Sequence, residues 1–188
     1  MRSGILALAL VSFAAVSCAK HPPDAARQIK VVRQFYSMVM SFKGGGVPSR
    51  AEIDSMSPLI SGDFREALLT ARAAEDREFQ RTKGSEPPLV EGALFYSLFE
   101  GPDRLTSIVP DVHQGPNSFL VTFESGDPKD KRNFVKWDDR AVLKSEDGRW
   151  VVQDLELLGG WQFGAKGRLS DILRAVADTV DQRRNPRM

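Results

Sequence analysis

The stretch Phe134–Leu158, FVKWDDRAVLKSEDGRWVVQDLELL, decides the fold. Two apolar runs, 134–145 and 149–158, flank Glu146-Asp147-Gly148, and a glycine that accepts positive φ at this place predicts a β-hairpin. Upstream, Ser118–Glu124 places Phe119, Val121 and Phe123 on one face and Ser118, Thr122 and Glu124 on the other, which is the pattern of a half-buried strand. Further strands are expected over 94–100 and 106–109. The second half of the chain therefore reads as an antiparallel meander.

Helical periodicity replaces this alternation on both sides of the meander. Ala25–Phe42 repeats apolar residues at steps of three and four, with Asp24 as the expected N-cap and a triple glycine as the stop. Two more helices are expected before the strands, a short one opened by the capping box Ser49–Glu52 and ended by Pro58, and a longer one over 63–83 capped by Ser61. The mixed charges of 75–81 indicate a solvated helix face. A last helix is expected over 169–182, with Ser170 as its cap.

This order predicts an α+β domain, with N-terminal helices packed on a curved antiparallel sheet and a C-terminal helix. We expect it to be a single domain spanning residues 25–182. The arrangement resembles the NTF2-like cone. More specifically, the chain resembles a family of bacterial envelope proteins that includes the YbjP lipoprotein, and the resemblance rests on 31–36, 87–88, 97–101, 147–154, Trp161 and 169–170. It implies the fold and an envelope location, and it brings no reaction with it.

The first residues predict export. Residues 1–17 hold one positive charge followed by an apolar, uncharged run of signal-peptide length, shorter than the roughly 20 residues of a membrane-spanning helix. Cys18 follows Ala15-Val16-Ser17, which resembles a lipobox apart from the alanine where leucine is usual. We expect Cys18 to be the lipidated N-terminus, with 18–24 as a short tether. The alternative is ordinary cleavage after Ala19, giving a soluble periplasmic protein.

Composition limits the function. The chain has 188 residues with 26 Lys+Arg against 25 Asp+Glu, and this balance argues against nucleic-acid binding. One cysteine and two histidines leave little material for a zinc site or for Ser-His-Asp catalysis. No cofactor and no metal are expected. Residues 183–188 form a basic tail, which suits either anionic headgroups or the end of the preceding helix.

Four residues form a candidate pocket: Tyr36, Trp150, Asp154 and Glu156. Asp154 and Glu156 stand two apart on one strand, so they share a face and could form an acid–base pair inside a cone. The alternative interpretation is that both acids are solvated while the leucines between and after them cover the core. Tyr36 lies on the apolar stripe of the first helix, where a tyrosine is usually a core residue.

Trp137, Trp161 and Phe163 are a candidate interaction surface, because aromatic side chains are enriched at binding hot spots. The sequence therefore favours a non-enzymatic envelope lipoprotein that binds another envelope protein, on the periplasmic side of the outer membrane by resemblance to known sorting rules. The alternative is a small-molecule-binding cone, or a weak enzyme using Tyr36 and Asp154.

Overall fold

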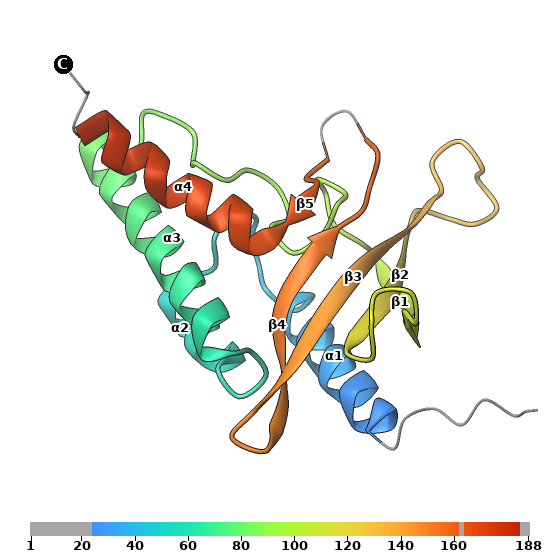
Figure 1. Ribbon diagram of the computed structural model, residues 1–188. Coiled ribbons are helices and arrows are strands. Elements are labelled where there is room, and N and C mark those ends of the chain that lie inside the picture. Colours follow the sequence, from blue (N-terminus) through green and yellow to red (C-terminus); the bar gives the residue numbers. More distant parts are fainter. Residues whose placement is uncertain (1–23, 162–163, 185–188) are drawn as a thin grey trace, which may run out of the picture.

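The computed structural model describes residues 24–161 and 164–184, and within them it shows an α+β fold. Three helices come first, then a five-stranded antiparallel sheet, then a C-terminal helix (Figure 1). The elements are α1 (Ala25–Val39), α2 (Arg50–Met56), α3 (Gly62–Thr82), β1 (Arg104–Pro110), β2 (Ser118–Ser125), β3 (Val135–Glu146), β4 (Arg149–Leu157), β5 (Gly167–Arg168) and α4 (Leu169–Arg184). The fold class predicted from the sequence is confirmed.

The sheet has the order β1-β2-β3-β4-β5, so every strand pairs with its neighbours in sequence. The predicted hairpin is present: Glu146 pairs with Arg149, and the two residues between them turn the chain. Asp147 has φ 52° and Gly148 has φ 74°, the left-handed conformations of a tight hairpin turn. The pattern of residues 134–158 therefore determines the centre of the sheet.

Helix α1 packs against one face of the curved sheet, which we call the inner face (Figure 1). Its predicted apolar stripe supplies Val32, Phe35, Tyr36 and Val39, all of them buried. Phe119, Val121 and Phe123 project from β2 toward this helix, as their alternation predicted. The helix ends at Val39 rather than at Phe42, and Asp24 precedes it without a side-chain capping bond. Asp24 thus occupies the predicted N-cap position, but its side chain makes no capping hydrogen bond.

Helices α3 and α4 lie side by side next to β4 (Figure 1). The predicted caps at the earlier helices are confirmed: Ser49 and Glu52 form a capping box, and the Ser61 hydroxyl accepts a hydrogen bond from the Phe64 amide at 3.2 Å. Among residues 24–161 and 164–184, no helix combines the length and apolar character that a membrane crossing requires.

Residues 94–100 form consecutive turns instead of the predicted strand. The segment is buried through Leu94, Phe95 and Tyr96, so its apolar composition does mark core residues. Its backbone amides bond to groups other than a neighbouring strand's backbone. The Ser97 amide donates to the Asp139 carboxylate on β3, and the Ala93 amide donates to the Phe99 carbonyl at 2.7 Å. A tertiary contact has overridden a local strand pattern here.

The charged half of α3 is only partly solvated. Glu75 and Glu78 are buried, at 5% and 4% exposure, which contradicts the prediction of a fully solvated face. Glu75 accepts hydrogen bonds from the backbone amides of Leu89 and Val90 at 3.2 and 3.0 Å. The Glu78 carboxylate forms an ion pair with the Arg81 guanidinium, 2.7 Å away. The carboxylate of Glu75 therefore fastens the proline-containing connection that follows α3 to the helix.

Candidate functional site

Asp154 and Glu156 share one face of β4, as predicted, and it is the face turned away from α1, which we call the outer face. The register places Asp154 opposite Val142 and Glu156 opposite Arg140, while Leu155 lies opposite Ala141 in the core. A bulge between Val142 and Leu143 shifts the alternation. The predicted pair of acids is thus separated from the interior by the sheet itself.

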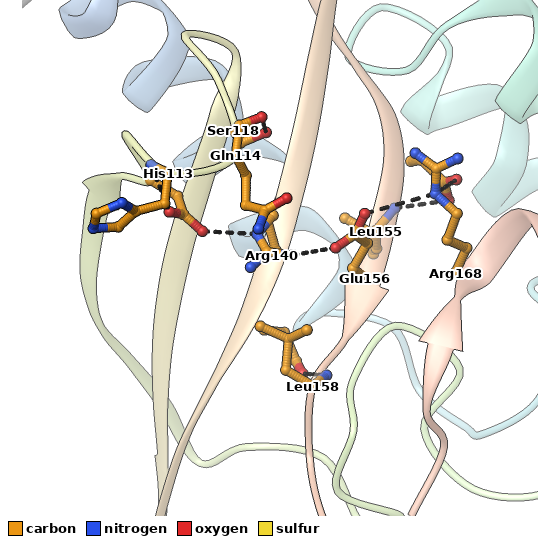
Figure 2. A network of polar contacts seen from close by, with 11 residues as sticks. His113, Gln114, Ser118, Arg140, Leu155, Glu156, Leu158 and Arg168 are labelled. Atoms are coloured by element: carbon orange, nitrogen blue, oxygen red, sulfur yellow. Dashed lines mark hydrogen bonds and ion pairs between the residues drawn. The ribbon is translucent and has the colours of Figure 1, made fainter.

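Arg140 is the centre of a charged network on the outer face (Figure 2). Its guanidinium contacts Asp111 at 2.8 Å on one side and hydrogen-bonds to Glu156 on the other. Arg168 extends the network across β5, with its Nε 3.6 Å from Glu156 and 3.7 Å from Asp154. Strand register produces this alignment, because Arg140, Glu156 and Arg168 are successive cross-strand partners.

Arg140 is held in its charged form by this network. Burial alone would lower the pKa of Arg140, but the hydrogen bonds to Asp111 and Glu156 outweigh it and raise that pKa. The Asp111 and Glu156 carboxylates are thus both engaged by one guanidinium. Together with Arg168 on β5, this arrangement suits charge positioning across three strands.

Asp154 caps helix α4 from a neighbouring strand. Its carboxylate accepts the Ser170 hydroxyl at 2.7 Å and the Ser170 backbone amide at 3.1 Å, close to the helix start. Ser170 is itself inside α4, so the prediction that it caps the helix was wrong. A carboxylate at a helix N-terminus satisfies a free amide and complements the helix dipole. Asp154 therefore joins β4 to the C-terminal helix.

Asp154 also lines a groove of about 630 Å³ between α3, β4 and α4. Phe64 and Leu173 contribute its apolar part, while Arg168 and Arg174 are among its charged residues. Neither Tyr36 nor Trp150 lines this groove. Trp150 is half-buried in a second groove of about 450 Å³, between the start of α1 and the tip of the β3–β4 hairpin. The structure therefore keeps Asp154 and Glu156 close together around Arg168 but brings neither Tyr36 nor Trp150 into the groove with Asp154.

Tyr36 lies in the interior, in a continuous series of aromatic contacts. Its ring packs edge-on against Phe123 at 5.0 Å and lies 5.9 Å from Tyr96, and Phe123 continues to Trp137 at 5.5 Å. The hydroxyls of Tyr36 and Tyr96 are buried and have no hydrogen-bond partner among the described residues. Burial raises the pKa of Tyr36 well above its usual value, and the charge of Asp139 adds to the effect. The phenol is therefore held in its neutral form.

Asp139 is a buried polar residue that was not among the candidate residues predicted from the sequence. Its carboxylate accepts hydrogen bonds from the Ser97 amide at 3.0 Å, the Ser97 hydroxyl, the Trp137 indole at 3.0 Å and the Leu158 amide at 2.9 Å. It is fully buried on the inner face. The two-residue periodicity of β3 could have predicted this burial, because Asp139 falls between the inward-facing residues Trp137 and Ala141.

The predicted aromatic surface is mostly internal. Trp137 is only 7% exposed and points to the core, so its assignment to a surface was wrong. The cause is again the inward position on β3, together with the bond from its indole to Asp139. Trp161 packs edge-on against Trp137 at 5.5 Å and is partly buried. Phe163 and Cys18 lie outside the described residues.

Apolar side chains border the charged network on the outer face. Val109 pairs with Leu120, and Leu120 pairs with Arg140, so these residues form one cross-strand row. Val109 is 45% exposed, and Leu158, which is drawn below Arg140 in Figure 2, is 38% exposed. We call Val109, Leu120, Arg140, Glu156 and Leu158 the outer patch. It combines apolar contact area with fixed charges next to the free edge of β1.

Two further findings bear on the site. Within the described residues, no cluster of three or more histidine, cysteine or acidic side chains is arranged to hold a metal ion. Comparison of the chain with protein-family models, with curated proteins and with solved structures finds no match in any of the three.

Proposed function

We propose that the protein is a lipid-anchored envelope protein whose domain binds another envelope protein through the outer patch. The anchor is Cys18, and the domain faces the periplasm, with the outer membrane as its site. The domain works as a binding module without a reaction of its own. The anchoring part of this proposal rests on the sequence of residues 1–18.

The observation that carries the binding role is the composition of the outer patch. Arg140 is held between Asp111 and Glu156, so its guanidinium is already oriented before any partner arrives. Val109 and Leu158 add exposed apolar area on either side of it. Protein interfaces combine an apolar centre with oriented polar groups, and arginine is enriched in them. A preorganised patch loses little side-chain entropy when it binds.

The alternative of a small-molecule cone or enzyme using Tyr36 and Asp154 receives less support. Tyr36 is in the aromatic interior, whereas Asp154 is engaged by Ser170 at the start of α4. The two groups do not converge on a shared cavity in the described part of the chain. The interior next to Tyr36 is occupied by Phe35, Tyr96 and Phe123.

Photo-crosslinking in native envelopes tests the outer patch. A photoreactive amino acid at Val109 or at Leu158 is expected to give the same discrete adduct. The same probe at exposed Glu66 on α3 is the matched control and is expected to give none. The introduction of Arg140→Glu should remove the adduct, because it reverses the charge at the centre of the patch. Identical adducts from all three positions, or none from the patch, would contradict the proposal.

The anchor makes a separate prediction. Two or more acyl chains, at about 0.8 kcal/mol per buried methylene, hold a protein stably on a membrane. Wild-type protein is therefore expected to remain with membranes through a high-salt wash and to show a lipid-modified peptide that begins at Cys18. Cys18→Ala should abolish the modification, as measured by mass spectrometry. A soluble mature chain that begins at Lys20 would overturn the assignment.

A further inference from the structure

Positive charge is concentrated at the start of the domain. Between residues 25 and 51 the chain has five cations, Arg27, Lys30, Arg33, Lys43 and Arg50, and no aspartate or glutamate, although the whole chain is nearly neutral. Three of these cations are on α1. The concentration therefore belongs to one element and does not reflect overall composition.

The cations of α1 lie on its exposed face. Arg27, Lys30 and Arg33 follow at steps of three, opposite the stripe that packs on the sheet, and all three are exposed. Among the side chains described, which are those of 24–161 and 164–180, Asp24 is the one acid that contacts them, 3.7 Å from Arg27. No ion pair in the same set involves Lys30 or Arg33. Two of the three charges therefore have no internal counterion in that part of the chain.

The chain length before α1 limits how far this face can be from the anchor. Residues 18–24 span about 23–25 Å when fully extended, at roughly 3.3–3.6 Å per residue. Helix α1 begins at Ala25, directly after this tether. Any surface to which Cys18 is attached is therefore within reach of Arg27 and Lys30. The basic tail at 183–188 has no such constraint.

We propose that the exposed face of α1, formed by Arg27, Lys30 and Arg33, docks on the anionic phospholipids of the membrane that holds the anchor. This inference rests on the proposed lipidation of Cys18. Anionic headgroups attract each nearby cation, and three cations favour the docked orientation by roughly a hundredfold over the undocked one. Docking orients the domain, and it leaves the outer patch, on the opposite face of the sheet, accessible to a partner.

The test uses the full-length, processed protein reconstituted in vesicles. One set contains phosphatidylcholine alone, and the other contains phosphatidylcholine with phosphatidylglycerol. An amine-acylating reagent is added, and mass spectrometry measures the labelling rate of each lysine. Lys30 is expected to react roughly tenfold more slowly on the anionic vesicles, because docking covers it. Lys83, at the end of α3, is the internal reference and should react equally on both. High salt should restore the rate of Lys30, since screening shortens the Debye length to about 3 Å at 1 M.

A pair of matched variants isolates the charge. Arg27→Gln with Arg33→Gln leaves Lys30 as the reporter and removes its neighbours, so Lys30 should react almost as fast as on neutral vesicles. Lys129→Gln with Lys131→Gln, in the exposed β2–β3 loop, removes the same charge elsewhere and should leave Lys30 protected.

If the protein fails to float with either vesicle, the anchor proposal is wrong. If it floats with both and Lys30 reacts equally on both, the docking inference is wrong and the anchor stands. If Lys30 were protected only in native envelopes and not on anionic vesicles, the ligand of the α1 face would be a protein, and the inference that it is an anionic phospholipid would be wrong.

Discussion

Replacing Phe35 with alanine is expected to lower the free energy of unfolding by about 3–5 kcal/mol, the usual cost of emptying a buried phenylalanine site. Phe35 is completely buried between α1 and the sheet. Its ring packs edge-on against Tyr36 at 5.1 Å and against Phe95 at 5.7 Å. Its removal therefore takes contacts from both the helix and the turns that follow residue 94. Urea unfolding of the purified domain measures the loss.

Phe79→Ala is the control for this experiment, since it makes the same chemical change at a side chain that is 61% exposed. Exposed substitutions away from special features usually change stability by about 0.5 kcal/mol or less. A large difference between the two variants is therefore expected. Equal losses would show that Phe35 is not a core residue and that the rotation of α1 on the sheet is wrong.

Asp139→Ala should be the most damaging change of a polar residue. The substitution removes the shared acceptor of the Ser97 amide, the Ser97 hydroxyl and the Trp137 indole, and leaves these three donors buried without a partner. Each such donor costs about 1–3 kcal/mol, so a total loss of at least about 3 kcal/mol is expected. Because the Trp137 indole is one of the donors, the tryptophan fluorescence of the folded protein should change as well.

Asp138→Ala is the matched control, because it removes the adjacent carboxylate from the same strand. Asp138 is exposed on the outer face, where it accepts a hydrogen bond from the Thr122 hydroxyl at 2.6 Å. A loss of about 1 kcal/mol or less is expected for such a bond. If Asp138→Ala proved as damaging as Asp139→Ala, the inward orientation of Asp139 would be refuted.

The contrast between these two acids shows what the sequence could predict. Local patterns were sufficient for the hairpin at Asp147-Gly148, for the buried stripe of α1 and for the capping box at Ser49. In each case the physical cause lies within a few residues of the pattern. The alternation of inward and outward side chains along β3 likewise indicates that Asp139 is buried.

The errors have a different origin, because they depend on residues far away in the chain. Asp154 caps a helix that begins 15 residues later, and nothing in the local strand pattern identifies Ser170 as its partner. Glu75 was expected in solvent because the backbone amides that bind it belong to a connection after the helix. The bulge beside Val142 changes which residues of β4 face inward. Such partners become visible only when the elements are packed.

The topology has a consequence for the order in which the protein folds. Each strand of the sheet pairs with the strand next to it in sequence, and pairing of this kind has a low contact order and is fast. Helix α1 is different, since it is synthesised first but packs on β1 and β4, more than 60 residues further on. The apolar stripe of α1 therefore stays exposed to solvent until the strands that cover it are available to fold. Aggregation of the unfolded chain should depend on this exposed stripe, and substitutions that make α1 less apolar should slow aggregation even where they weaken the folded state.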